Sequence, residues 1–303
     1  MKPHQIYEDK IIYDGSGHVA SCGITEQNEG TTCTVSFTLT EDVDEELMVY
    51  YELTNFYQNH RRYVGSRSPR QLMGYLVDDD DLSLECDPLW KNGSYVLNPC
   101  GLIANSYFND VISCTTQNMD ETDISWASDR DKKFKQPTQP NGGFQKQEKD
   151  GSCPEDMSEA DDSSGTAYCY WYPNNDNVQY LYETYPQISP LDGVEDEHFI
   201  VWMRTAGLPN FRKLYGKIEG TGLVKGTVIT FDIVQNFDVS SFEGTKSIVI
   251  STVGPFGGKN PYLGIAYIVV GSISIFFGCL FAIKYHFFPR EENHLSNLLR
   301  KDN

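Results

Sequence analysis

The sequence predicts a mainly β protein: an antiparallel β-sandwich-like ectodomain with few short helices, followed by one C-terminal transmembrane helix. Several segments of strand length alternate apolar and polar residues, the pattern of a strand with one face in a core. Helical periodicity is rare, and many short alternating strands favour packed antiparallel sheets. One uncharged apolar segment, residues 262–283, stands apart near the C-terminus.

The first predicted strand is residues 32–39, TCTVSFTL, in which every second residue is apolar. The same alternation recurs in two later segments, 47–53 and 226–234. Residues 247–253 are a further short strand, and the apolar run 199–203 has strand length. The clearest helical pattern is 208–218, where Pro209 suits the first turn of a helix. The expected strands are 32–39, 47–53, 199–203, 226–234 and 247–253.

Residues 262–283 have the length of a membrane-spanning helix. Their 22 uncharged residues rise about 33 Å as an α-helix, enough to cross a bilayer core. Basic residues follow directly from Lys284 onward, whereas only Lys259 lies close on the other side. Basic flanks stay in the cytosol, so we expect a cytosolic tail at 284–303 and an exoplasmic ectodomain at 1–261.

The N-terminal sequence poses a problem for this topology. An ectodomain needs a translocation signal, and MKPHQIYEDKIIYDG contains no apolar core. We therefore expect an additional apolar span with basic flanks upstream of Met1. The single N-glycosylation sequon, Asn92-Gly93-Ser94, lies on the side expected to be exoplasmic, with Asn92 as the acceptor.

The eight cysteines agree with an oxidising compartment. Cys279 lies within the apolar span, and the other seven suggest three disulfides and one remaining thiol. Residues 115–170 are polar and glycine-rich, and we expect a long surface excursion rather than a domain. A bridge between Cys153 and Cys169 would staple its most acidic part, although the pairing of these two and Cys114 stays open.

The formal net charge of −19, from 43 acidic and 24 basic residues, argues against a nucleic-acid partner. The chain contains no CxxC, HExxH, GxSxG or P-loop pattern. The acidic run 78–81 lacks the glycine and closing glutamate of an EF-hand and is expected to be a solvated loop. The acidic run 195–197 is expected to be a strand-flanking surface turn. We therefore expect no catalytic residue, no metal and no cofactor.

The densest unusual stretch is 50–67, YYELTNFYQNHRRYVGSR, which gathers aromatics, amides and cations in a very acidic chain. Arginine suits either of two roles, because its planar fork binds carboxylates bidentately. Arg61 and Arg62 could pair with the protein's own carboxylates, or they could face a partner together with Asn59 and Tyr63. Both readings stay open on the sequence alone.

At this stretch the chain resembles the Cdc-fifty, or ligand-effect-modulator, family. Four blocks carry the resemblance, in family order and spread over most of the chain: NFYQNHRRYV (55–64), PCGLIANSYFND (99–110), EDEHFIVWMRTAGLPNFRKLYGKIEG (195–220) and GGKNPYLGIAYIVVGSIS (257–274).

The resemblance implies a non-catalytic accessory subunit of a type IV P-type ATPase, a phospholipid flippase, in which ATP hydrolysis belongs to the partner. It implies two membrane helices, cytosolic termini, and a glycosylated β-rich ectodomain over the ATPase. It also implies membrane-lipid contact, assembly and exit from the endoplasmic reticulum, and residence there, in Golgi or endosomal membranes, or in the plasma membrane.

The resemblance also bears on the cysteines and on the first helix. The family's first membrane helix has no counterpart here. The family often carries two cysteine pairs near the first strand, where this chain has only Cys22 and Cys33. Cys86 and Cys100 match the position of the family's second disulfide. We expect bridges Cys22–Cys33 and Cys86–Cys100.

Small residues recur on one side of the predicted span. Gly264, Gly271 and Gly278 are spaced by seven residues, and Ser274 falls on the same side. Small residues let membrane helices approach closely, so we expect this stripe to contact the ATPase.

The alternative from another class is a stand-alone single-pass surface receptor or lectin-like adhesion glycoprotein. Composition and topology do not separate it from a subunit, whereas the four blocks do. A lumenal hydrolase is disfavoured, because no nucleophile–base constellation appears.

Overall fold

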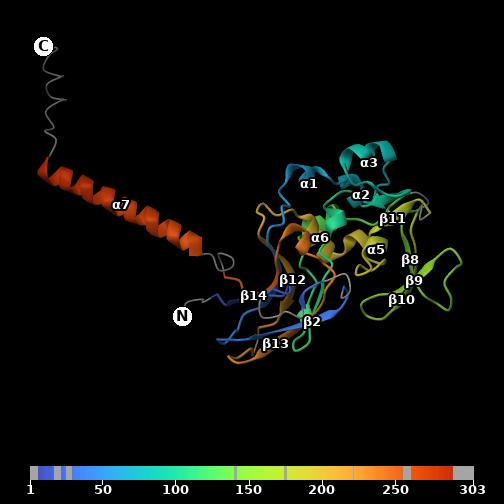
Figure 1. The fold of residues 1–303 in the computed structure, drawn as a ribbon, viewed down its shortest axis with the longest axis horizontal. Coiled ribbons are helices and arrows are strands. Elements are labelled where there is room, and N and C mark those ends of the chain that lie inside the picture. Colours follow the sequence, from blue (N-terminus) through green and yellow to red (C-terminus); the bar gives the residue numbers. More distant parts are fainter. Residues whose placement is uncertain are drawn as a thin grey trace, which may run out of the picture. The chain divides into compact units, whose positions relative to one another are not determined.

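The computed structural model describes residues 6–16, 22–24, 29–139, 142–173, 176–220, 222–254 and 261–288. The chain divides into two compact units, Met1–Val253 and Gly254–Asn303. The first, which we call the β-rich unit, holds all strands and short helices found in the described ranges. The second contains the long helix α7, Pro261–Phe287 (Figure 1).

The strands of the β-rich unit are β1 (Glu8–Ile12), β2 (Thr32–Thr38), β3 (Leu47–Leu53), β4 (Lys91–Asn92), β5 (Tyr95–Asn98), β6 (Val111–Cys114), β7 (Met119–Asp120), β8 (Gln145–Glu148), β9 (Ser158–Asp161), β10 (Ala167–Trp171), β11 (Val178–Tyr180), β12 (Phe211–Ile218), β13 (Val228–Val234) and β14 (Lys246–Thr252). Its helices are α1 (Arg61–Gly65), α2 (Pro69–Leu72), α3 (Asp79–Glu85), α4 (Ala127–Lys132), α5 (Leu181–Thr184) and α6 (Glu197–Met203), with 3-10 turns η2 (Ala104–Ser106), η3 (Gly193–Glu195) and η4 (Ser240–Phe242).

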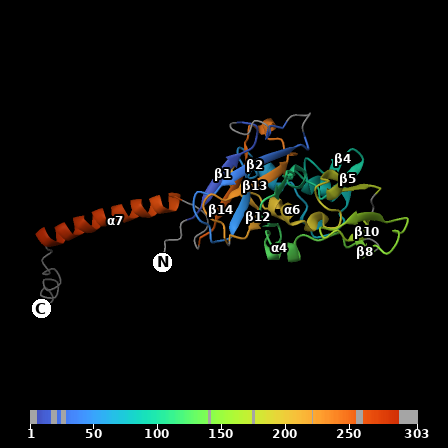
Figure 2. The ribbon, with the colours of Figure 1, turned by 90° about the horizontal axis from the view of Figure 1, so that it is seen from below.

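Two antiparallel sheets make the body of this unit. One has the order β1-β14-β3-β12-β7 and the other β2-β13-β6. Figure 2 shows the strands of both sheets gathered together, away from β8 and β10. One hydrophobic core draws on both sheets, and within it Phe37 of β2 meets Phe231 of β13 edge-to-face with ring centroids 5.9 Å apart. The predicted mainly β, antiparallel fold is confirmed.

Two smaller sheets lie beside the body, with the orders β11-β5-β4 and β8-β10-β9. Strands β11 and β5 run parallel, unlike the other pairs within the described sheets. The β8-β10-β9 sheet lies within and just beyond the expected polar excursion, residues 115–170. The sequence did not predict it, because all four residues of β8 are exposed and carry no apolar alternation.

Residues 199–203, expected to be a strand, belong to helix α6. The side chain of Asp196 accepts a hydrogen bond from the backbone N–H of Phe199 at 2.8 Å and so caps the first turn. A short apolar run fits a strand or a buried helix equally well, and here the cap decides. The interpretation of 195–197 as a strand-flanking turn is therefore also wrong, because these residues end η3 and open α6.

Residues 208–218, expected to be helical, contain strand β12 instead. It pairs with β3 on one side and β7 on the other, so both of its edges are occupied. A bulge between Leu214 and Gly216 shifts the register, so the buried residues depart from a period of two and hide the strand pattern. A Cβ on Gly216 would lie 2.7 Å from Cγ of Met119 on β7, so the neighbouring strand leaves little room for a side chain there.

Three disulfides close short loops in the β-rich unit. They join Cys22 to Cys33, Cys86 to Cys100, and Cys153 to Cys169, with Cα–Cα distances of 5.2, 5.8 and 5.5 Å. Cys114 and Cys279 are thiols. The Cys86–Cys100 bridge lies in a small core of its own with Leu82 and Leu97.

Helix α7 is long and apolar enough to span a membrane, and within the described part of the chain no other helix is. It covers the expected span 262–283 and continues to Phe287. Its large apolar side chains are exposed, which suits a lipid environment rather than water. Of the expected tail, residues 289–303 lie outside the described residues.

Candidate partner-binding surface

Two loops of the β-rich unit, residues 54–60 and 204–210, lie against each other, and we call them the two-loop surface. They belong to two of the four family-like blocks. Four hydrogen bonds join them: Asn55 N to Asn210 Oδ1 (3.0 Å), Phe56 N to Pro209 O (3.0 Å), Asn59 Nδ2 to Gly207 O (3.0 Å) and Ala206 N to Gln58 Oε1 (2.9 Å).

Aromatic packing fixes this surface to the core. The ring of Phe56 lies 5.7 Å from that of Trp202, centroid to centroid, and also contacts Phe211 and Tyr63. Trp202 is completely buried and donates from its indole nitrogen to the carbonyl of Ile103 at 2.7 Å. The loops are therefore held by packed rings as well as by backbone hydrogen bonds.

Large apolar side chains project from these fixed loops. Tyr57 is 57% exposed and Leu208 is 69% exposed. Arg61, at the start of α1, is also exposed, and its side chain makes no ion pair or hydrogen bond to any described residue. Exposed aromatic, aliphatic and arginine side chains on a rigid support are typical of protein–protein contact surfaces.

The other predicted partner-binding residues of this stretch have internal contacts. Asn59 holds the second loop through its bond to Gly207. Arg62 forms an ion pair with Asp87 at 3.2 Å, with both side chains largely exposed. Tyr63 shares a hydrogen bond of 2.8 Å with Ser106, and burial raises the pKa of Tyr63 to about 12. Of these three, Arg62 is the one that pairs with a carboxylate of the protein itself.

Sequence reasoning missed two exposed residues, one beside this surface and one on it. Trp126 is 66% exposed, and the guanidinium of Arg204 lies 5.0 Å from the centre of its ring. Trp126 lies in the polar excursion 115–170. A single tryptophan in such a polar segment is the sequence feature that could have indicated an exposed contact residue. Leu208 was also missed, because it was placed at the start of a helix that does not form.

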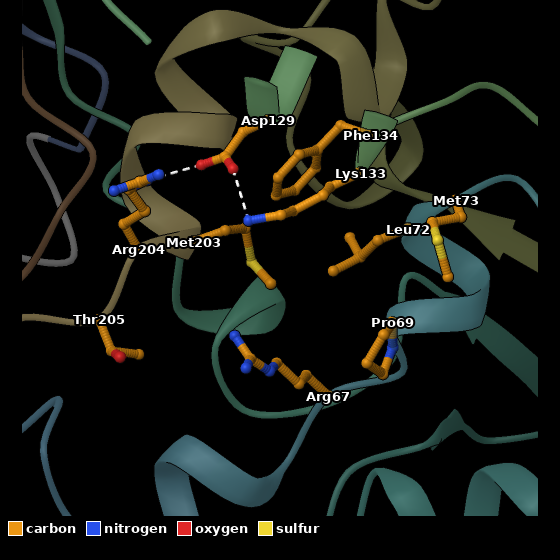
Figure 3. A pocket seen from close by; sticks show the side chains of 10 residues that line it. All are labelled: Arg67, Pro69, Leu72, Met73, Asp129, Lys133, Phe134, Met203, Arg204 and Thr205. Carbon is orange, nitrogen blue, oxygen red and sulfur yellow. Dashed lines mark hydrogen bonds and ion pairs between the residues drawn. The ribbon is translucent and has the colours of Figure 1, made fainter. Parts of the chain in front are cut away.

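A cleft of about 530 Å³ adjoins the second loop (Figure 3). It lies between the segment before α2, the end of α4 and the end of α6. Its lining combines cations with apolar side chains: Arg67, Pro69, Leu72, Met73, Asp129, Lys133, Phe134, Met203, Arg204 and Thr205.

Asp129, the carboxylate of this lining, forms ion pairs with two neighbouring cations. Its side chain is 3% exposed and lies 2.6 Å from Nε of Arg204 and 2.7 Å from Nζ of Lys133. The hydrogen bond from Arg204 outweighs the effect of burial and lowers the pKa of Asp129. The carboxylate therefore orients the two cations at the rim of the cleft.

Lys213 of β12 fixes the backbone beneath Arg204. Its ammonium donates to the carbonyl oxygens of Val201, Trp202 and Arg204 at 2.9, 2.6 and 2.6 Å. These groups end α6, where a cation is favourable. Burial lowers the pKa of Lys213 to about 7, while the three carbonyls favour its charged form.

The structure places the remaining candidate chemistry in structural roles. Asp78 precedes α3 and residues 79–81 form its first turn, where Asp79 and Asp81 pair with Lys91 and Arg70 rather than lying in a solvated loop. Within the described residues, no three His, Cys, Asp or Glu side chains are close enough to hold a metal ion.

The predicted glycan acceptor, Asn92, is the last residue of β4, directly before the turn that leads to β5. It is exposed, and its Nδ2 donates to Oε1 of Gln179 at 2.9 Å. Because this hydrogen bond is at the surface, a modifying enzyme can reach the side chain once the bond opens.

The small residues of α7 face open space. A Cβ placed on Gly264, Gly271 or Gly278 would meet no atom within 4 Å. The hydroxyl of Ser274 donates to the carbonyl of Val270 within the helix, at 2.8 Å. Within the described part of the second unit, nothing therefore requires these residues to be small.

Comparison with known proteins gives a match over nearly the whole chain. The model of the LEM3 (ligand-effect modulator 3)/CDC50 family matches residues 4–291. The chain is 34% identical to Cell cycle control protein 50A of Mus musculus over 308 residues, 96% of this chain and 79% of the mouse protein. It is 38% identical to Putative ALA-interacting subunit 4 of Arabidopsis thaliana, over 87% of this chain and 69% of the plant protein. It is 36% identical to Phospholipid-transporting ATPase accessory subunit CRF1 of Saccharomyces cerevisiae, over 86% of this chain and 61% of the yeast protein.

Proposed function

The chain belongs to the LEM3/CDC50 family, and from that membership we propose that it is the non-catalytic accessory subunit of a phospholipid-transporting ATPase. The observation that carries the proposal is the family match over residues 4–291, together with a yeast relative named as such a subunit and a plant relative named as an interacting subunit. Hydrolysis of ATP and movement of lipid then belong to the ATPase.

The two-loop surface supports a binding function. Its exposed Tyr57 and Leu208 stand on loops held by four hydrogen bonds and by the ring of Phe56, and the exposed Arg61 follows the first loop at the start of α1. Rigid loops lose little conformational entropy on binding, so such side chains contribute more of their contact energy to a complex.

The basic flank of the span supports the topology of this proposal. Residues 1–261 are exoplasmic, 262–283 cross the membrane, and 284–303 are cytosolic. The disulfides and the exposed sequon at Asn92 suit an oxidising, glycosylating compartment. The subunit is needed for the ATPase to assemble, leave the endoplasmic reticulum and transport lipid, and it accompanies it to Golgi, endosomal or plasma membranes.

Co-purification tests the proposal. The tagged chain, expressed at its native level and extracted in mild detergent, should bring down a P-type ATPase identifiable by mass spectrometry. Recovery of the chain without an ATPase contradicts the proposal.

The glycan supplies a second readout that separates a subunit from a surface receptor. Expressed without an ATPase, the chain should keep an endoglycosidase-H-sensitive glycan at Asn92, because it stays in the endoplasmic reticulum. Co-expression of its ATPase should make the glycan resistant, and Asn92→Gln should abolish the signal. Equal resistance with and without the ATPase favours the receptor.

A further inference from the structure

We propose that the cleft between α2, α4 and α6 receives an acidic side chain, carried on a partly apolar segment of the partner ATPase. The inference rests on the proposed function and adds the chemistry of one contact to it. Arg67 is the residue that binds the carboxylate, and the ion-paired wall of Arg204, Asp129 and Lys133 faces it.

Arg67 is poised for an anion that the described chain does not supply. Its side chain makes no ion pair or hydrogen bond to any described residue, although the chain is strongly acidic. Figure 3 shows it entering the cleft from the side opposite Asp129. A guanidinium offers two parallel N–H donors, which match a carboxylate.

The backbone on both sides of Arg67 is fixed. Ser66 is buried, donates to the carbonyl of Cys86 at 2.9 Å and accepts from the N–H of Leu102 at 3.0 Å. Ser68 is buried and caps α2. The backbone N–H of Arg67 donates to the carbonyl of Glu85 at 3.2 Å. The backbone that carries the cation is therefore held in position before any ligand arrives.

The opposite wall adds positive charge instead of cancelling it. Arg204 and Lys133 share one carboxylate, Asp129, so the lining holds three cations against one anion. The side chains of Arg204 and Lys133 remain 48% and 63% exposed. An entering carboxylate would meet a net positive site within a protein whose net charge is −19.

The apolar part of the lining indicates which groups should flank the carboxylate of the ligand. Phe134, Met203 and Leu72 are buried beneath the cations, and Met73 lies at the rim. Apolar walls weaken solvent screening and strengthen an ion pair with Arg67. They also favour a ligand whose neighbouring groups are apolar, as in a polypeptide segment with an acidic residue among hydrophobic ones.

The position of the cleft favours the ATPase polypeptide over a lipid phosphate or a second copy of this chain. Arg204 and Thr205 line the cleft and begin the second loop of the two-loop surface, and Arg67 follows α1 after one residue. A polypeptide lying on Tyr57 and Leu208 would therefore continue into the cleft.

A photocrosslinker at the rim tests the occupant. p-Benzoylphenylalanine would replace Met73 in the full chain, co-expressed in cells with its ATPase and irradiated in membranes. The expected product is an adduct with an ATPase peptide that contains Asp or Glu beside apolar residues. An adduct with lipid, with a second copy of this chain, or no adduct while the ATPase still co-purifies overturns the inference and leaves the proposed function standing. Loss of ATPase co-purification with the unmodified chain overturns both.

The yield of the photocrosslinked adduct, measured in charge variants, tests the role of Arg67. Arg67→Gln should lower adduct yield about tenfold, the effect of losing a charge-assisted hydrogen bond. Arg67→Lys keeps the charge but not the two parallel N–H donors, so its adduct yield should lie between those of the wild type and Arg67→Gln. Lys132→Gln, a change of the same charge on the exposed side of α4, should leave the yield unchanged. Equal yields for Arg67→Gln and Lys132→Gln overturn the role of Arg67.

Discussion

Nζ of Lys246 lies 2.8 Å from Oδ2 of Asp110, and the two side chains are 1% and 0% exposed. The ammonium also donates to the carbonyl of Phe237 at 2.9 Å, and the hydroxyl of Tyr13 donates to the same carboxylate oxygen at 3.0 Å. The other oxygen, Oδ1, accepts from two backbone N–H groups of the 236–237 loop. The pair ties β14 to the segment before β6, and so connects the two main sheets.

The first prediction follows from this pair. Lys246→Met should destabilise the β-rich unit by about 3–5 kcal/mol, because it leaves the Asp110 carboxylate buried without its cation. Thermal unfolding of the full chain in detergent, followed by tryptophan fluorescence, measures the effect. Lys146→Met, a change on the exposed strand β8, is the control. Unfolding temperatures that agree for wild type and Lys246→Met would show that the ion pair is dispensable.

The second prediction concerns pH and His198 of α6. Burial by itself lowers the pKa of His198, but the hydrogen bond to Glu121 at 2.8 Å and the charges of Asp196, Glu121 and Glu197 outweigh it and raise the pKa. The ring lies against that of Tyr215, with centroids 4.3 Å apart and the ring planes tilted by 35°. A raised pKa means that the folded state binds the proton more tightly than the unfolded one. This stabilisation is complete below the unfolded value of about 6.5 and is lost as pH rises through the folded value.

His198→Gln should therefore lower the unfolding temperature more at pH 6 than at pH 8. The exposed His60 provides the matched control, and His60→Gln should change both temperatures by similar small amounts. A deficit for His198→Gln that is the same at both pH values would exclude a contribution from the protonated ring.

The third prediction tests the Cys86–Cys100 bridge. Its loop spans a sequence separation of 14 residues, so the double change Cys86→Ser, Cys100→Ser should cost on the order of 3 kcal/mol in the chain-entropy model. Cys114→Ser, at a thiol, should cost much less. Non-reducing peptide mapping should recover the 86–100 pair from wild type, and free thiols at both positions would contradict the structure.

Local patterns predicted part of the fold, and the failures have identifiable causes. Strands β2 and β13 have one face in the core, so their burial alternates and their sequence shows it. Strand β12 has a bulge beside Gly216, and α6 has only seven residues, so neither shows a clear period.

Among the candidate sites, those contiguous in the sequence could be predicted, and those assembled by the tertiary fold could not. The 55–64 block was recognised because it is contiguous in the sequence. The cleft was not, because Arg67, Asp129 and Arg204 are brought together by the tertiary fold alone. Exposure of Tyr57, Trp126 and Leu208 likewise depends on packing that no local pattern records.

The last prediction concerns the small-residue stripe of α7. At about 100° per residue, seven residues complete nearly two turns, so Gly264, Gly271 and Gly278 lie on one side of the helix. Lipid supplies little hydrophobic drive for helix association, and small residues permit close packing of backbones instead. Glycine is also common in membrane helices for other reasons, so the stripe needs a direct test.

Gly271→Leu separates these explanations, because a side chain at Gly271 meets nothing within 4 Å in the isolated helix. The substitution should leave membrane insertion intact, since leucine inserts readily. If the stripe packs against the ATPase, overpacking should weaken the complex by about 1–3 kcal/mol and reduce the ATPase recovered with the tagged chain. Ile273→Leu, a volume-conserving change two residues from Gly271 and so on nearly the opposite side of α7, should leave recovery unchanged. Equal recovery for both variants would mean that α7 does not use its glycines to bind the ATPase.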